Sequence, residues 1–149
     1  MRYIIISIIL LYTMSLEAKV TVNTASYQKI IKNGKKKWVK ASIIVPNTTI
    51  LYINTISNTS NNIAKELVID NTIAKEISYI KYSAKSKLKS KITYSVNNGK
   101  SYHKPNRLYI KRKGKRVKAK ASDYTNIRWT INQLKSKEST TVRYLAKLK

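Results

Sequence analysis

The residues with the clearest chemical potential are the Lys and Arg side chains that crowd the second half of the chain. Between Ile77 and Ser122 there are fifteen Lys or Arg residues and no Asp or Glu. Such a dense positive field attracts polyanions and binds them with a strong dependence on salt. The candidate polyanion-binding residues are those of the densest run: Lys111, Arg112, Lys113, Lys115, Arg116, Lys118 and Lys120.

Aromatic residues accompany this run, because Tyr102 and Tyr109 lie just before it. Tyrosine rings stack on bases or sugars. For an exported bacterial protein, the anionic polymers that we expect are an acidic glycan, lipopolysaccharide or extracellular DNA. The chain contains no recognition-helix or zinc-finger pattern, and we therefore expect no sequence-specific reading of nucleic acid. The alternative is a solvated, purely compositional charge, because the net charge of +25 belongs to a chain that is rich in Lys, Asn and Ile throughout.

The residues that catalysis would need are sparse. A nucleophile requires a base held beside it, and His103, the one histidine, lies in the turn-rich stretch SYHKPN. No cysteine and no acidic cluster is present, which argues against a metal site. The acids after residue 18 occur singly among basic or turn residues, so we expect them to form ion pairs or to stabilise turns. They are Glu66, Asp70, Glu76, Asp123 and Glu138. The sequence predicts a non-catalytic protein without a metal or cofactor.

Short strands separated by turn residues must position the basic run. Asn33-Gly34 lies between two extended runs and predicts a hairpin. Asn97-Asn98-Gly99-Lys100 predicts a second hairpin, and Lys113-Gly114-Lys115 predicts a turn after the short strand Leu108–Lys111. Lys85–Lys91, a Lys-rich stretch without a clear pattern, predicts a loop. The basic run is thus expected at a turn rather than on a helix.

The stretch from Val45 to Asp70 is expected to organise the fold. Thr49–Ser57 is rich in β-branched and aromatic residues, Asn58–Asn62 is a run of turn formers, and Ala64–Asp70 is a second extended run. Strand propensity around a turn cluster predicts a pair of strands.

The end of the chain carries the remaining core signals. Thr140–Leu148 alternates apolar and polar residues, which is typical of a half-buried strand. Trp129, within the strand Ile127–Leu134, is a natural core anchor, and Tyr124 just before it is also expected to be structural. No segment shows a convincing helical period, so the sequence predicts an all-β antiparallel sandwich of seven to nine strands.

The N-terminus has the pattern of a secretory signal peptide. Met1–Ala18 begins with Arg2, continues with the apolar run Tyr3–Tyr12 and ends in polar and small residues, with cleavage expected after Ala18 or Ser15. The apolar run is too short to span a membrane as a helix, and no second such run follows. We therefore expect residues 19–149 to form one exported domain without a transmembrane segment, in the periplasm or at the cell surface. The absence of cysteine favours a bacterial envelope.

Three stretches together resemble a known family. VPNTTILYINTISNTSNNIAKELVIDN, ITYSVNNGKSYHKP and SDYTNIRWTINQLKSKESTTVRYLAKLK occur in the order of the motifs of the bacterial conserved-repeat domain, also called domain of unknown function eleven. The resemblance implies an immunoglobulin-like β-sandwich in secreted or surface-attached proteins, with no known enzyme activity. This chain departs from the family pattern at a few positions: Asn47 and Ser60 replace glycines, Asn71-Thr72 lacks the expected proline, and Asn54 replaces an apolar residue.

Composition, pattern and resemblance predict an exported, non-catalytic module with a structural or adhesive role in the cell envelope. Its expected partner is then an envelope or surface protein. The alternative is a polyanion-binding protein that acts through the Lys/Arg-rich hairpin region.

Overall fold

The structure is a computed structural model that describes residues 19–149; the predicted signal peptide, Met1–Ala18, lies outside the described residues. The described part is built from short strands and two single-turn 3-10 helices, η1 (Pro105–Arg107) and η2 (Ala121–Asp123). The strands are β1 (Val20–Lys32), β2 (Lys35–Lys40), β3 (Thr49–Asn58), β4 (Ala64–Thr72), β5 (Ile77–Tyr79), β6 (Lys85–Ser86), β7 (Ser90–Ser95), β8 (Tyr109–Arg112), β9 (Lys115–Lys118), β10 (Asn126–Leu134) and β11 (Ser139–Leu148).

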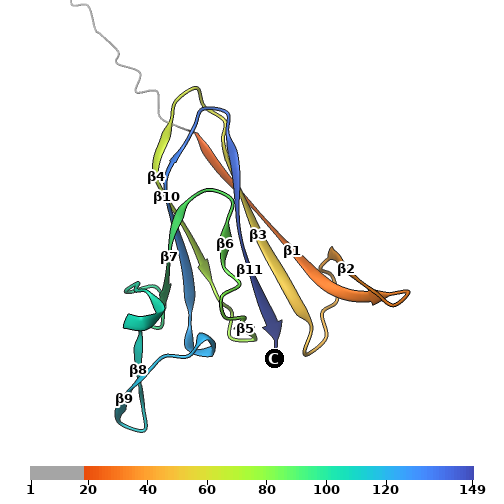
Figure 1. Ribbon diagram of the computed structural model, residues 1–149, viewed down its shortest axis with the longest axis vertical. Coiled ribbons are helices and arrows are strands. Elements are labelled where there is room, and N and C mark those ends of the chain that lie inside the picture. The colour runs from red at the N-terminus through yellow and green to blue at the C-terminus, as the bar shows by residue number, and fades with distance from the viewer. Residues whose placement is uncertain (1–18) are drawn as a thin grey trace, which may run out of the picture.

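Two antiparallel sheets face each other (Figure 1). Sheet A has the order β2-β1-β3-β11-β5, with β6 also paired to β11, and sheet B has the order β4-β10-β7. The β1–β2 hairpin projects from one side of the sandwich as an arm, and the β8–β9 hairpin hangs below β7. The predicted all-β antiparallel sandwich is confirmed. Residues 19–149 hold eleven strands rather than seven to nine, because short edge strands such as the two-residue β6 are counted with the long ones.

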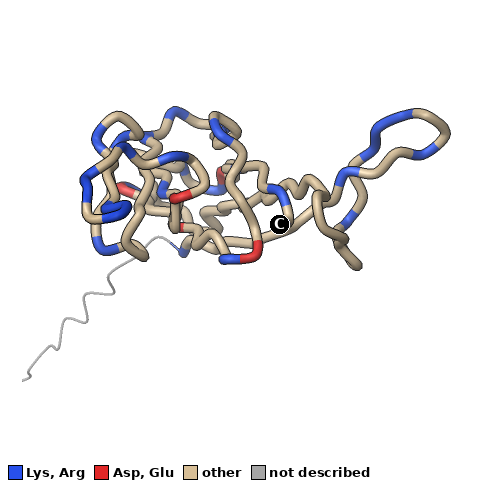
Figure 2. Tube along the Cα trace, turned by 90° about the horizontal axis from the view of Figure 1, so that it is seen from below, with Lys and Arg blue, Asp and Glu red and all other residues tan. Residues whose placement is uncertain are grey.

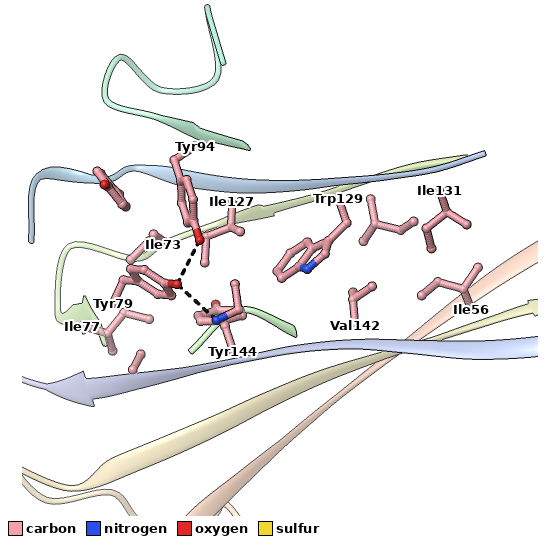
Figure 3. Close-up of a cluster of buried hydrophobic side chains, with 14 of the residues drawn as sticks. Ile56, Ile73, Ile77, Tyr79, Tyr94, Ile127, Trp129, Ile131, Val142 and Tyr144 are labelled. Carbon is pink, nitrogen blue, oxygen red and sulfur yellow. Dashed lines mark hydrogen bonds between the residues drawn. The ribbon is translucent and has the colours of Figure 1, made fainter. Parts of the chain in front are cut away.

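The core lies between β10 of sheet B and β11 of sheet A (Figure 3). Trp129 on β10 is 0% exposed, and its indole ring centroid lies 6.2 Å from that of Tyr144 on β11. Val142 and Ile56 complete this part of the core from sheet A. Full burial of a Trp side chain removes a large apolar area from water, so the prediction of Trp129 as the core anchor is confirmed. The predicted alternation of the last strand is confirmed as well, because Val142, Tyr144 and Ala146 are buried in turn.

Four tyrosines form one aromatic cluster in the core of this chain, which contains no phenylalanine. The rings of Tyr79, Tyr94, Tyr124 and Tyr144 contact one another, with centroids between 4.7 and 6.3 Å apart. Buried phenols need hydrogen-bond partners. The Tyr79 and Tyr94 hydroxyls bond each other at 3.1 Å, and the Ala84 amide donates to the Tyr79 oxygen at 3.1 Å (Figure 3). Burial, and then the bond to Tyr79, raise the pKa of Tyr94.

The predicted pairing of the two strands between Val45 and Asp70 is wrong. β3 lies in sheet A between β1 and β11, whereas β4 lies in sheet B beside β10, so the chain crosses from one sheet to the other. Asn58, which is 1% exposed, holds this crossing. Its side-chain amide donates to the carbonyl oxygens of Asn62 at 2.6 Å, Lys135 at 3.0 Å and Leu134 at 3.2 Å. The amide thereby links the β3–β4 connection to the β10–β11 connection, which also passes from one sheet to the other.

Asn54 bonds across the core. Its amide donates to the Asn71 side-chain oxygen at 2.6 Å, and its own oxygen accepts a bond from Thr24 at 3.0 Å. The ladder of β3 stays in regular register there, and the polar residue that departs from the family pattern is satisfied inside the sandwich.

The Lys-rich stretch Lys85–Lys91 is ordered rather than a free loop, which corrects the sequence interpretation. Lys85 and Ser86 pair with Arg143 and Val142 as the short strand β6. The chain then crosses to sheet B and enters β7 at Ser90. Ala84, Ser86 and Leu88 turn toward the protein, and the intervening lysines are exposed. The alternation of small or apolar residues with lysine allows the stretch to lie along the sandwich.

The turns predicted at Asn33-Gly34 and Lys113-Gly114 are confirmed, whereas after Asn97–Lys100 the chain returns to β7 through the single bridge Tyr94–His103 and not as a second strand. Asn33 and Gly34 have φ of 51° and 69°, and Lys113 and Gly114 have φ of 50° and 77°. Two consecutive residues with positive φ define the turn that matches the twist of a tight hairpin. No helix in residues 19–149 has the length and apolar character needed to cross a membrane.

Candidate polyanion-binding surface

The β8–β9 hairpin carries most of the predicted polyanion-binding residues. All seven are exposed, and six of them lie between Tyr109 and Lys118, while Lys120 follows the hairpin. The hairpin joins the body at Leu108, a core residue that is 2% exposed and whose carbonyl oxygen accepts the Ala119 amide at 3.0 Å. Within the hairpin, Ile110 and Val117 are half-buried. A small apolar anchor therefore presents a basic loop to solvent.

The register of the hairpin sorts its cations onto two faces. Lys111 lies opposite Arg116, and Tyr109 lies opposite Lys118. Because directly opposite residues share a face and neighbours along a strand alternate, these four side chains lie on one face of the hairpin. The other face carries Arg112 opposite Lys115, and Ile110 opposite Val117.

Arg112 is engaged within the protein through its side chain, and Lys120 is held through its backbone amide. The Arg112 guanidinium donates to both carboxylate oxygens of Asp123, at 3.0 and 3.2 Å. The same carboxylate accepts the backbone amide of Lys120 at 2.7 Å and closes the η2 turn. The structure thus places Arg112 in an internal ion pair, apart from Lys111, Arg116 and Lys118.

The cations on the Tyr109 face are held close together without an acid. The ion pairs of residues 19–149 are Arg112–Asp123 and Arg128–Asp70, and neither includes Lys111, Arg116 or Lys118. Like charges directly opposite on a ladder destabilise it. The Arg116 guanidinium lies 4.1 Å from the centroid of the Tyr109 ring, which orients it. A bound anion would relieve the repulsion between the opposed cations.

Two hollows extend this face toward β7. One, of about 310 Å³, is lined by Lys91, Lys104, Arg107 and His103 together with neutral polar side chains. The second, of about 200 Å³, shares His103 and Arg107 with the first and reaches Tyr109 and Arg116 on the hairpin. Shared lining residues make the surface continuous. We call it the basic track and define it by its cations: Lys91, Lys104, Arg107, Lys111, Arg116 and Lys118.

Half of the basic track was not predicted. Lys91, Lys104 and Arg107 lie outside the densest run of the sequence, and the fold brings them to it. The bridge between Tyr94 and His103, with both N···O distances at 3.0 Å, sets Lys91 and Lys104 on one side of the β7 turn. The turn signal at Asn97–Lys100 contains this information, because a hairpin there brings the residues on either side of it together.

Asp70, whose negative charge is compensated by an ion pair, lies beside the basic track. The Arg128 guanidinium bonds Asp70 at 2.7 Å and lies 3.5 Å from the ring centroid of Tyr102, whose hydroxyl donates to the same carboxylate. Burial raises the pKa of the Asp70 carboxyl, but bonds from Tyr102, Arg128 and Asn126 outweigh it and hold the pKa below its usual value. Asp70 therefore stays ionised and paired, and leaves the neighbouring cations available.

The acids serve the roles expected of them where the structure shows their contacts. Asp70 and Asp123 form ion pairs, and the Glu138 carboxylate accepts the Lys135 amide at 2.8 Å in the turn before β11. His103 is exposed beside the basic track. Within residues 19–149, no three His, Asp or Glu side chains converge in a way that would hold a metal ion.

Positive charge is not confined to the basic track. Figure 2 shows Lys and Arg around the body and along the projecting β1–β2 arm, with Asp and Glu at few places. Lys35, Lys36 and Lys37 are all exposed at the end of this arm. A test of the basic track therefore needs a control in which equal charge is removed from the arm.

Comparison with known proteins adds no relative. No family model matches the chain, no curated protein matches it, and no solved structure matches it. The resemblance to the bacterial conserved-repeat domain accordingly stays a prediction from the sequence motifs.

Proposed function

We propose that this protein is a non-catalytic β-sandwich module that binds acidic polymers along the basic track. The observation that carries the proposal is the opposed pair Lys111 and Arg116, held on one face of a hairpin beside Tyr109 without an acid partner. A rigid ladder keeps these charges together at a cost in free energy that an anion removes.

The shape of the surface favours a polymer over a small anion. The hollows are shallow and joined end to end, and they lead from Lys91 to the hairpin cations. Successive anionic groups of one chain would contact successive cations and release the counterions around them. The exposed face of Tyr109 would contact a ring of the polymer between two such groups.

A structural or adhesive role in the envelope is the second candidate, and an open sheet edge favours it. β2 is an edge strand of sheet A on the projecting arm, where its free backbone groups are available to a strand from another protein. β4, an edge of sheet B, is less suited to this because Glu66, with φ of 53°, interrupts its regular geometry. The signal-peptide pattern and the family resemblance support export for both candidates.

The test is binding of the protein to an acidic glycan, lipopolysaccharide and DNA over a series of salt concentrations. A protein of equal net charge and unrelated fold serves as the reference. The proposal requires that, at physiological salt, at least one polymer binds this protein more tightly than it binds the reference protein. If every polymer binds both proteins equally and is released by salt, the charge is compositional. Cross-linking to an envelope protein that depends on the β2 edge would then favour the adhesive role.

A further inference from the structure

Another hollow, separate from the basic track, lies on the outer face of sheet A. It consists of two adjoining depressions of about 300 and 360 Å³ that share Lys85 and Arg143. We call it the sheet A groove. One end is lined by Trp38, Leu51 and Leu145, and the other end by Ile53, Lys87 and Thr141.

Two cations meet at the centre of the groove. Arg143 on β11 is the direct cross-strand partner of Lys85 on β6, and both are exposed. Neither takes part in the ion pairs of residues 19–149. Opposed like charges destabilise a ladder, and an anionic group between the two side chains would compensate both. Lys87 lines the same depression and adds a third positive charge.

An apolar surface adjoins the cations. Leu51 on β3 and Leu145 on β11 are direct cross-strand partners on the outward face of the sheet. The Trp38 side chain of β2 lines the same depression and is 42% exposed, although the other tryptophan, Trp129, is fully buried. Exposed apolar side chains that line a hollow together with cations indicate a ligand with an apolar face as well as a negative charge.

We propose that the sheet A groove binds an acidic sugar unit, a pyranose ring that carries an anionic group. The ring presents an apolar C–H face that fits Trp38, Leu51 and Leu145, and its anionic group fits between Arg143 and Lys85. Both features must lie on one compact unit, because cations and apolar side chains share a single depression. A nucleotide separates its flat base from its phosphate by a sugar and fits this arrangement less well.

This site is independent of the proposed function, since none of its residues belongs to the basic track. The groove is on sheet A, whereas the basic track runs from β7 of sheet B to the β8–β9 hairpin. Two anion-binding surfaces on one chain would allow it to bridge two segments of an acidic glycan and gain avidity.

The test uses the different exposure of the two tryptophans. Trigalacturonate is the acidic probe, and a neutral trisaccharide is its control. We expect trigalacturonate to protect Trp38 from quenching by acrylamide, while the buried Trp129 is unaffected. A Trp38→Leu variant should lose the fluorescence response, which assigns the signal. Near-ultraviolet circular dichroism, dominated by the buried aromatic residues, reports that each variant keeps its fold.

Affinity measurements by titration calorimetry complete the test. Lys85→Gln and Arg143→Gln should each weaken trigalacturonate binding about tenfold, the loss expected for one charge-assisted hydrogen bond. A Lys65→Gln variant, altered at an exposed lysine of β4 that lines neither the groove nor the basic track, should bind trigalacturonate as the unaltered protein does. The proposal is overturned if the neutral sugar protects Trp38 equally, if neither groove variant weakens binding, or if hexaglutamate or an oligonucleotide protects Trp38 better than trigalacturonate. Binding that weakens equally in the Lys65 variant would also overturn the proposal, because affinity would then follow net charge.

Discussion

Removal of the cations on the Tyr109 face of the hairpin should change the salt dependence of polyanion binding by a predictable amount. The perturbation is the triple variant Lys111→Gln, Arg116→Gln and Lys118→Gln. All three side chains are exposed and lie outside the ion pairs found in residues 19–149, so their replacement leaves the core and the Arg112–Asp123 contact intact. Relief of the opposed Lys111 and Arg116 charges offsets the loss of the contact between Arg116 and the Tyr109 ring, so the stability of the hairpin should change little.

The magnitude follows from the number of cations that contact the polymer. For a single-stranded nucleic acid, the logarithm of the binding constant falls with the logarithm of salt concentration by about 0.7 for each neutralised phosphate. The basic track offers six cations, which gives a slope of about −4 if all are used. Removal of three cations should reduce the slope to about −2 and weaken binding roughly 50-fold at about 0.15 M salt.

The assay is fluorescence anisotropy of a labelled single-stranded oligonucleotide, chosen as a polyanion of known charge spacing. The matched control is the triple variant Lys35→Gln, Lys36→Gln and Lys37→Gln on the β1–β2 arm, which removes the same charge from exposed positions. None of these lysines lines a hollow of the basic track. A slope that falls equally in both variants, or in neither, would refute the argument, because binding would then follow net charge or would use another surface.

Further predictions concern the parts that hold the sandwich together. Asn58→Leu should lower the free energy of unfolding by about 3 kcal/mol, measured by urea denaturation, because it leaves buried carbonyl groups without a donor. Asp70 has a lowered pKa, so its stabilisation is complete above the pKa of an unfolded Asp and is lost as the pH falls through its folded pKa. The Asp70→Asn variant should therefore show a smaller acid-induced fall in melting temperature. Tyr94 has a raised pKa, so its contribution is complete below the pKa of an unfolded Tyr and is lost as the pH rises. Tyrosinate absorbance should show Tyr94 ionising only together with alkaline unfolding. Because burial also raises the pKa of Tyr124 and Tyr144, a Tyr94→Phe variant should reduce the amplitude of this late step by one tyrosine. Ionisation of Tyr94 in the folded protein would contradict the effect of burial.

Local signals predicted the turns well because the backbone angles leave few choices. Asn-Gly and Lys-Gly between extended runs specify two consecutive positive φ values, and the turns at Asn33-Gly34 and Lys113-Gly114 have them. The same local signals could not distinguish a hairpin from a crossing between sheets at Asn58–Asn62. The choice depends on the bonds from Asn58 to the carbonyls of Leu134 and Lys135, more than seventy residues away. Local sequence preferences do not predict contacts between residues so far apart in the chain.

The basic surface divides in the same way. Strand alternation around Lys113-Gly114 is enough to place Lys111, Arg116 and Lys118 on one face, and the sequence could have given this result. The sequence could not show that Arg112 forms an ion pair with Asp123 and so does not join these cations. Nor could it show that Lys91 and Arg107 extend the basic surface. Those relations arise from the η2 turn and from the packing of β7 against the segment that ends at η1.

Net charge alone cannot locate a binding site in this chain, because 31 Lys and Arg face only 6 Asp and Glu. Most cations must lack an acid partner, whether or not they have a function. Fixed geometry is the better criterion, since a ladder holds the Cβ atoms of an opposed pair close together, whereas cations elsewhere on the surface have no fixed neighbour. Lys32 opposite Lys35, at the tip of the β1–β2 arm, is also such a pair. The arm control therefore removes a fixed repulsion too, and a difference between the variants would isolate what the hollows and Tyr109 add to the charge.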